Sequence, residues 1–467
     1  MKKYFLCLLF SVMFFPFQSD AQENYPFVAE TDPQALKSLD QWSDWKFGLL
    51  MHWGAYSVWG IVESWSLCPE DVGWTTRRNG NFENYYEYKK EYENLPMKFN
   101  PVKFNPERWA KAARAAGMKY MVFTTKHHDG FCMFDTKQTD YKITNPKYPF
   151  AGNPKADVTK SIFNAFRAEG LGVGAYFSKP DWHTEYYWWP YFPPKARSVN
   201  YEIAKYPERW QKYKDFTFNQ IQELTQNYGK VDILWLDGGW VRPDSTIDEK
   251  VEWERGLPPG QDVDMGRIAK MARQNQPGII VVDRWVPGPY ENYHTPEQTI
   301  PEKPLPYPWE SCMTLGDSWS YVPRDNFKPA EKILHNLVDI VSRGGNYLLN
   351  VAPGPDGEWD EGAYQKLKEI GAWMQINGNA IYNTRPLSPY VETQNLRFTQ
   401  SKDGTSTYCF VMDNVTQIRI AAVGTKKVKQ LSALGYNKKL GFKKEGRDLV
   451  VNLPSDWKST IRVIRME

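Results

Sequence analysis

The sequence has few of the residues on which metal and redox chemistry depend. It contains 5 cysteines and 6 histidines among 467 residues. Cys7 lies in an N-terminal apolar run, and none of the spacings between Cys68, Cys132, Cys312 and Cys409 is a metal-site pattern such as C-x-x-C. The H-E-x-x-H motif of zinc enzymes is also absent. We therefore expect no metal and no cofactor, and we interpret the four remaining cysteines as mostly buried free thiols.

An excess of one charge and long apolar segments are equally scarce. The 58 Lys and Arg residues nearly balance the 55 Asp and Glu residues, and the net charge of +3 gives no basic surface for nucleic acid or an anionic membrane. One long apolar run, Tyr4–Phe17, follows Lys2 and Lys3 and precedes a small-residue site ending at Ala21. This pattern predicts a signal peptide over residues 1–21, too short for a membrane span. We expect export to the periplasm or the extracellular space.

Aromatic residues, by contrast, are abundant. The chain has 20 Trp, 28 Tyr and 24 Phe. A large core accounts for many of them, because aromatic side chains bury the most apolar area per residue. Sugar binding is the alternative interpretation, since flat rings stack on the apolar C–H face of a pyranose. Composition alone does not separate the two.

Short apolar segments alternate with longer amphipathic stretches through most of the chain. This order predicts parallel βαβ units and, over residues 22–382, a (β/α)₈-like barrel of the TIM type. A Rossmann-type sheet is disfavoured because no G-x-G-x-x-G follows the first strand. The residues from Pro287 to Trp309 are expected to form long loops. The expected strands are Lys46–Trp53, Lys119–Thr125, Gly172–Ser178, Val231–Asp237, Gly278–Trp285 and Asn346–Val351, and the expected helices are Pro106–Ala116, Asp157–Ala168, Tyr206–Tyr228, Asp264–Gln274, Pro329–Arg343 and Glu361–Gln375.

The pattern changes after Ile381, where helical periodicity disappears. Short strand-like runs alternate with turn residues, which predicts a small antiparallel β-sandwich domain over residues 383–467. The runs are Thr407–Met412, Arg419–Val423, Leu449–Leu453 and Thr460–Met466.

Polar and aromatic residues stand at the ends of five successive expected strands. Because the carboxyl ends of all strands in a parallel barrel face one mouth, we expect these side chains to converge there. The five ends are His52-Trp53, His127-His128-Asp129, Tyr176-Phe177-Ser178, Trp235-Leu236-Asp237 and Asp283-Arg284-Trp285.

Asp237 is the strongest catalytic candidate among them. It ends an apolar strand and precedes two glycines, and Trp235 shares its face because side chains alternate along a strand. The alternative is an ordinary helix cap. Glycoside hydrolysis requires a second carboxyl group. Four acids lie in the segment after the fifth strand, and spacing alone does not rank them: Glu291, Glu297, Glu310 and Asp317.

The adjacent histidines His127 and His128 invite a metal interpretation. On an extended segment they point to opposite faces, so we do not expect them to chelate one ion. Hydrogen bonding to sugar hydroxyls fits better, and a satisfied core histidine is the remaining alternative.

Several motifs together resemble the α-L-fucosidases of glycoside hydrolase family 29, over roughly Lys46 to Arg385. The Thr295-Pro296-Glu297 and Trp309-Glu310-Ser311-Cys312 pieces are similar to the broad-specificity branch of that family. The other matching pieces are Lys46–Gly54, Thr125–Cys132, Leu234–Gly238, Asp283–Trp285 and Gly344–Val351.

The resemblance implies a retaining, exo-acting hydrolase that removes terminal α-L-fucose from fucosylated oligosaccharides or glycoconjugates. It implies that Asp237 is the nucleophile and Glu297 the acid/base. Glu63-Ser64-Trp65 stands where the family has Glu-Trp-Tyr, so Glu63 and Trp65 are expected beside the sugar. The remaining positions implied to bind or enclose the sugar are His52, His127, His128, Tyr176, Trp235, Arg284 and Trp319.

Two alternatives remain at this point. One is a different retaining exo-glycosidase on the same barrel, with an α-galactosidase-like activity. The other is a non-catalytic fucose-binding barrel, which the presence of two candidate acids disfavours. The fucosidic linkage, the role of the C-terminal domain and the oligomeric state are left open by the sequence.

Overall fold

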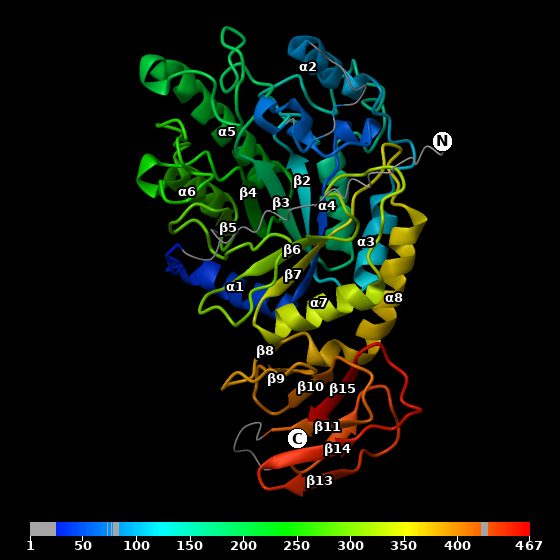
Figure 1. Cartoon of the computed structure of the whole chain (residues 1–467). Coiled ribbons are helices and arrows are strands. Elements are labelled where there is room, and N and C mark those ends of the chain that lie inside the picture. Colours follow the sequence, from blue (N-terminus) through cyan, green and yellow to red (C-terminus); the bar gives the residue numbers. More distant parts are fainter. Residues whose placement is uncertain (1–24, 72, 76, 78–83, 422–427) are drawn as a thin grey trace, which may run out of the picture.

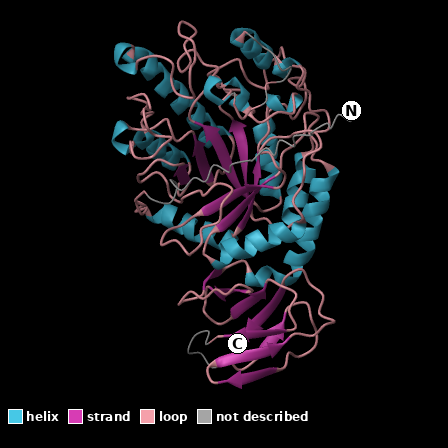
Figure 2. Cartoon of the chain, in the orientation of Figure 1, coloured by secondary structure: helices cyan, strands magenta, loops and turns pink. Residues whose placement is uncertain are grey.

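A curled sheet of parallel strands forms the centre of the molecule (Figures 1 and 2). The computed structural model describes residues 25–71, 73–75, 77, 84–421 and 428–467, so the expected signal peptide lies outside the described residues. The strand order is β5-β4-β3-β2-β1-β7-β6. The strands are β1 (Phe47–Met51), β2 (Tyr120–Lys126), β3 (Gly172–Ser178), β4 (Ile233–Asp237), β5 (Ile280–Asp283), β6 (Glu310–Thr314) and β7 (Asn346–Asn350).

The gap between the edge strands β5 and β6 is bridged by an irregular segment, residues 290–298. Its backbone binds both neighbours: the Asn292 N–H donates to Val281 O at 2.9 Å, and the Glu310 N–H donates to His294 O at 2.8 Å. This closing segment therefore occupies the eighth place in the barrel. As expected, residues 287–309 contain no helix or strand, but isolated bridges join residues 291, 294 and 297 to the sheet, and Glu310 begins strand β6.

Helices cover the outer face of the sheet (Figure 2). Several begin at a side-chain cap; for example, the Asp157 carboxylate accepts the Lys160 N–H at the start of α4. Gly117 and Gly170, in the left-handed region at φ 92° and 74°, follow α3 and α4 closely. The helices are α1 (Pro33–Trp45), α2 (Tyr85–Glu93), α3 (Pro106–Ala115), α4 (Val158–Ala168), α5 (Pro207–Asn227), α6 (Met265–Asn275), α7 (Ala330–Ser342) and α8 (Glu361–Asn377).

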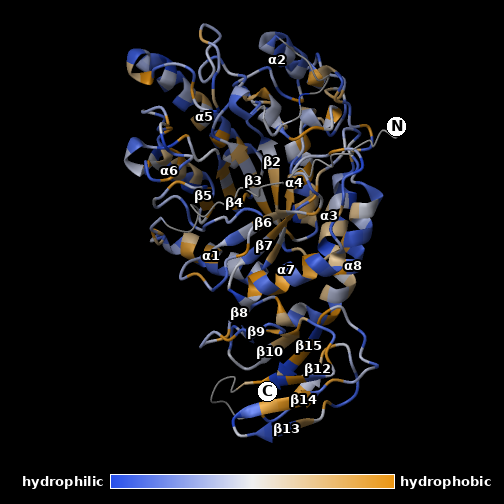
Figure 3. Cartoon of the chain, viewed as in Figure 1, coloured by the Kyte–Doolittle hydropathy of each residue, from blue (hydrophilic) through white to orange (hydrophobic). Residues whose placement is uncertain are grey.

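Both faces of the parallel sheet are buried, as expected for strands enclosed by helices. The side chains of β1, β2 and β3 are buried along their whole length. Figure 3 shows the same strands as an apolar centre beneath more polar helices. Bulky rings fill the inside of the barrel, among them Tyr120, Tyr176, Trp235 and Tyr293. The interior is therefore a packed core that leaves room for a ligand only near the mouth.

The C-terminal strands form a sheet of five, in the order β12-β15-β10-β9-β8, and a sheet of three, in the order β11-β14-β13. Apolar residues of both sheets share one core, which confirms the β-sandwich. The predicted run ending at Val423 extends beyond the described residues, and β11 ends at Ile420. The strands are β8 (Thr384–Pro386), β9 (Leu396–Ser401), β10 (Thr407–Val411), β11 (Gln417–Ile420), β12 (Leu431–Ala433), β13 (Phe442–Glu445), β14 (Asp448–Asn452) and β15 (Arg462–Met466).

This sandwich packs near the amino end of β1, at the end of the barrel away from the strand carboxyl termini (Figure 1). Arg385 and Lys402 bind the carboxylates of Asp40 and Asp44 at the end of α1. The Trp373 indole of α8 donates to Ile461 O at 3.0 Å. Polar contacts and a shared apolar face therefore join the two parts.

The four cysteines in the described part of the chain are free and buried, as expected from their spacing. None of the helices that the structure describes combines the length and apolar character of a membrane span.

Gly371 of α8 lies against the backbone of α3, because a Cβ placed there would stand 2.3 Å from Ala115 O. We expect Gly371→Ala to lower the free energy of unfolding by about 1–3 kcal/mol through overpacking. Urea denaturation provides the measurement. Gly152→Ala is the control, since a Cβ at Gly152 meets nothing within 4 Å; equal stability of the two variants would contradict the close packing.

Candidate active site

An enclosed cavity of about 50 Å³ lies at the carboxyl ends of the barrel strands. Most of the predicted site residues line it, although they come from widely separated parts of the chain. Trp65 and His128 stand just outside this lining. The cavity is lined by Leu50, His52, Glu63, His127, Tyr176, Trp235, Asp237, Arg284, Glu297, Cys312 and Trp319.

A wider cleft of about 1050 Å³ opens between the loops that follow β3 and β4, with Arg197 and Trp253 in its walls. None of the predicted site residues lines it. The enclosed cavity is therefore the better candidate for the chemistry, despite its smaller size.

Asp237, the last residue of β4, is held as a carboxylate. The Tyr176 hydroxyl donates to Oδ2 at 2.6 Å, and Arg284 Nη1 donates to Oδ1 at 3.1 Å. Burial alone raises the pKa of Asp237, but the charge of Arg284 and the Tyr176 hydrogen bond outweigh it and hold that pKa well below its usual range. Asp237 is therefore an ionised group at the edge of the cavity, suited to attack a positively polarised carbon.

Arg284 contacts two carboxyl groups at once. Nη1 binds Asp237 of β4, and Nη2 binds Glu297 of the closing segment. Nε donates to Thr295 Oγ1 at 3.0 Å, so the whole guanidinium fork is used. The rings of Trp235 and Trp285 lie 4.9 and 4.0 Å from its Cζ. The two acids that the resemblance singled out thus meet across one cation, from chain positions sixty residues apart.

The histidine tautomers follow from their neighbours. The Asn350 amide donates to Trp319 O, so its Oδ1 accepts from His52 Nδ1 at 2.9 Å. The Ser178 hydroxyl donates to Pro180 O and therefore accepts from His128 Nδ1 at 2.6 Å. Both rings keep Nε2 as an acceptor. Burial lowers the pKa of His52 to about 4 and that of His128 to about 3, so both are neutral near pH 7.

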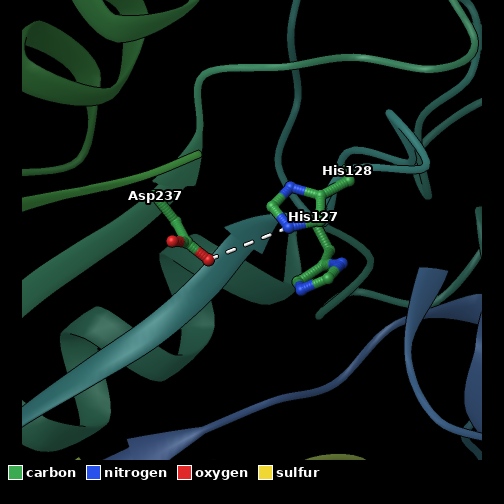
Figure 4. A group of neighbouring side chains, drawn as sticks. All are labelled: His127, His128 and Asp237. Atoms are coloured by element: carbon green, nitrogen blue, oxygen red, sulfur yellow. Dashed lines mark ion pairs between the residues drawn. The ribbon is translucent and has the colours of Figure 1, made fainter. Parts of the chain in front are cut away.

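The expectation that His127 and His128 point to opposite faces is wrong. Their ring centroids are 4.1 Å apart, because the chain turns after β2 instead of continuing as an extended strand. Figure 4 shows both rings near Asp237, with His128 Nε2 3.9 Å from Asp237 Oδ2. One ligand atom from each of the three residues lies within 4.8 Å of the others, close enough for a shared ion.

The partners of these histidines suit a sugar better than a metal. Histidines that bind metals usually donate their other N–H to a carboxylate, a carbonyl or water. Here the other nitrogens bind serine hydroxyls, Ser64 for His127 at 2.5 Å and Ser178 for His128. His128 Nε2 has no hydrogen-bond partner among the described residues. A buried acceptor of this kind requires a donor from a ligand, such as a hydroxyl group.

Glu63 and Trp65 were both expected beside the sugar, but only Glu63 lines the cavity. Glu63 lines the cavity at 1% exposure, and burial, reinforced by the negative charge of Glu297, raises its pKa to about 8. Trp65 lies behind His128 at a ring distance of 4.9 Å and packs against Trp182. Glu63 therefore faces the ligand directly, whereas Trp65 supports a histidine.

Sequence reasoning assigned no orienting role to the side chains that hold the predicted residues in place. Ser64, Ser178 and Asn350 fix three imidazoles, and Thr295 fixes Arg284. Ser178 and Asn350 are the last residues of β3 and β7, so their strand-end position was the available signal.

Comparison with known proteins identifies the family. Residues 14–379 match the family model described as α-L-fucosidase. The chain belongs to the α-L-fucosidase family. It is therefore a glycoside hydrolase.

Solved and curated relatives agree with this assignment. This fucosidase is 30% identical to α-L-fucosidase isoenzyme 1 from Paenibacillus thiaminolyticus, with a TM-score of 0.74 over 93% of this chain and 99% of that chain. It is 27% identical to the tissue α-L-fucosidase of Bos taurus, over 90% of this chain and 85% of the relative. A GH29 α-L-fucosidase from Bacteroides thetaiotaomicron, trapped as a covalent intermediate with 2-fluoro-fucosyl fluoride, shares the fold: TM-score 0.74, 22% identity, 95% and 98% coverage.

The lowered histidine pKa values predict an acid-sensitive fold. The unfolded chain protonates its histidines below about pH 6.5, while buried His52 and His128 stay neutral to about pH 4 and 3, so they favour folding above pH 6.5 and this contribution falls as the pH drops. The substitution His128→Gln removes the contribution of one of these two histidines to the pH dependence of stability. Between pH 7.5 and 5 we expect the variant to lose about 1–2 kcal/mol less unfolding free energy than the parent in urea titrations.

The half-exposed His335 of α7 provides the control substitution, His335→Gln. A His128→Gln variant with the same pH dependence as the parent would show that His128 is not a buried neutral histidine.

Proposed function

We propose that this fucosidase hydrolyses terminal α-L-fucosides of glycans by double displacement, with retention at the anomeric carbon. The observation that carries the proposal is the contact of Arg284 with both Asp237 and Glu297. Two carboxyl groups bound to one guanidinium cannot be far apart. They therefore stand at the range of a glycosidase acid pair, and retention is supported by the covalent intermediate trapped in the related Bacteroides thetaiotaomicron fucosidase.

In the first step Asp237 attacks the anomeric carbon. The bond from this carbon to the leaving oxygen breaks, and Glu297 gives its proton to that oxygen. Arg284 and Tyr176 keep Asp237 ionised, which preserves its nucleophilicity.

In the second step a water molecule attacks the fucosyl–enzyme ester. Glu297 now accepts the proton from this water, fucose leaves, and Asp237 returns to its carboxylate form. Support for a covalent intermediate comes from the Bacteroides thetaiotaomicron fucosidase, which was trapped in that state.

The cavity wall matches a single terminal sugar. His52 and His128 present neutral acceptors for sugar hydroxyls, and the rings of Trp235 and Trp319 supply apolar surface. The small volume at the mouth of the barrel leaves no room for a glycan chain that continues on both sides. Neither an α-galactosidase-like activity nor a catalytically silent barrel is favoured by any contact in the site. Parallel assays with aryl α-L-fucosides and aryl α-D-galactosides separate these possibilities.

Asp237→Asn is expected to reduce hydrolysis of aryl α-L-fucosides to background, because the amide cannot form the ester. Fucose binding should survive, since the amide retains the shape of the carboxyl group. Steady-state kinetics and calorimetry supply the two measurements. Substantial turnover by the Asn variant would remove Asp237 from the role of nucleophile.

Glu297→Ala is expected to slow the hydrolysis of natural fucosylated oligosaccharides by about 10²–10⁴-fold, the usual contribution of a general acid. For aryl fucosides with good leaving groups, the rate of the first step should fall less, because the leaving oxygen needs little protonation. Added azide should speed turnover of these aryl substrates and give the α-fucosyl azide, detected by NMR. Equal losses on both substrate classes, or a β-azide product, would contradict this role.

Export is part of the same proposal. A signal peptide over residues 1–21 is supported by Lys2 and Lys3 before the apolar run from Tyr4 to Phe17. Exported enzyme should begin at Gln22 by mass spectrometry and appear in the periplasmic or extracellular fraction. Full-length enzyme confined to the cytoplasm would refute export.

A further inference from the structure

The N-terminal segment, residues 25–30, lies against the closing segment that carries Glu297. We propose that it acts as a strap for the active site and that Tyr25 is a positioning residue for Arg284 and Glu297, through Glu291. This inference rests on the proposed role of Glu297 as the acid/base. Neither Tyr25 nor Glu291 lines the cavity, so any effect on catalysis must pass through their neighbours.

The contact at the centre of the strap joins Tyr25 to a buried acid. The Tyr25 hydroxyl lies 2.8 and 2.7 Å from the two carboxyl oxygens of Glu291. Glu291 is only 1% exposed, and an interior carboxyl group is costly unless it is hydrogen-bonded. Burial raises the pKa of Glu291 to about 8. Tyr25 therefore satisfies a group that the rest of the site leaves far from solvent.

Glu291 transmits this contact to the catalytic arginine. Its Oε1 accepts the backbone N–H of Trp285 at 2.9 Å. Trp285 adopts φ 64°, a left-handed conformation that is unfavourable for a large side chain and requires support from its surroundings. Arg284 immediately precedes Trp285. A fixed Trp285 backbone therefore fixes the direction in which the Arg284 side chain leaves the chain.

The strap also holds the closing segment itself. The His294 ring stands between Tyr25 and Tyr307, with centroid distances of 4.5 and 4.4 Å. His294 Nε2 lies 3.4 Å from Glu291 Oε2. The next residue, Thr295, accepts Arg284 Nε, and Glu297 follows two positions later. Loss of the Tyr25 contact would loosen Arg284 and Glu297 together.

Glu30 anchors the other end of the strap. It forms an ion pair with Arg273 of α6 and accepts from Asn292 Nδ2 at 2.8 Å. Asn292 Oδ1 in turn accepts the Val281 N–H of β5 at 2.9 Å. The strap thus binds residues 291, 292 and 294 of the closing segment and connects them to a strand and a helix of the barrel.

The test compares two substrate classes in the enzyme that begins at Gln22. Tyr25→Phe removes the hydroxyl and keeps the ring that contacts His294. Because a small misplacement of catalytic groups costs up to about 10²-fold, we expect kcat/KM, which reports the first step, to fall about 10- to 100-fold on a fucosylated oligosaccharide. We expect less than about threefold loss on 2-chloro-4-nitrophenyl α-L-fucoside, whose leaving group needs little acid assistance.

Three further variants distinguish a positioning role from an effect on stability. Tyr228→Phe removes a hydroxyl that likewise donates to a carboxylate, Asp157 at 2.9 Å, away from the cavity. It should change kcat/KM on the two substrates equally. Glu291→Gln keeps an oxygen for the Trp285 N–H and should restore most of the oligosaccharide activity that Glu291→Ala loses.

The outcomes distinguish this inference from the function on which it rests. If Glu297→Ala slows both substrates equally, the acid role fails and the strap fails with it. If the loss caused by Glu297→Ala depends on the leaving group and the loss caused by Tyr25→Phe does not, only the role of the strap is refuted. Equal behaviour of Tyr25→Phe and Tyr228→Phe, or of Glu291→Gln and Glu291→Ala, also refutes it. A leaving-group dependence shared by Tyr25→Phe and Glu297→Ala supports it.

Discussion

The guanidinium of Arg284 is the group on which the geometry of the site depends. Its burial is tolerable because every nitrogen has an acceptor and two indole rings lie close to its Cζ. Removing water from a charge of this kind is costly, and paired acids with good geometry offset the cost. The same pairing decides the chemistry, because it brings Asp237 and Glu297 to one place and helps to hold Asp237 as a carboxylate.

Further buried ion pairs surround this arginine and hold the strand ends in register. Lys179, just after β3, binds Asp283 at the end of β5 and the Val241 carbonyl in the loop after β4. Arg242 from that same loop binds Glu254 at 2.8 Å. These contacts tie neighbouring loops to one another, so the catalytic side chains stand on a rigid rim. Precise placement of this kind is what catalysis by oriented groups requires.

Much of this fold can be predicted from the sequence. Short apolar runs mark the strands, amphipathic stretches mark the helices, and Gly or Pro follows most of the helices. The expected ranges for β1–β5 and β7 lie within about two residues of the observed ones. Predictions failed where local pattern is weak. β6 begins with the buried acid Glu310, which Tyr120 and Tyr293 satisfy, and periodicity cannot reveal such distant partners. The turn at His127 and His128 and the contact of Tyr25 with Glu291 likewise depend on tertiary packing.

The position of the C-terminal sandwich has a consequence for access. It attaches beside the amino end of β1, whereas the cavity opens where the strands finish. A bulky fucosylated glycoprotein that approaches the opening therefore encounters only barrel loops. Attaching a tag, resin or cell-wall tether to the terminal strand β15 leaves the cavity accessible, so this end of the molecule is suited to immobilisation.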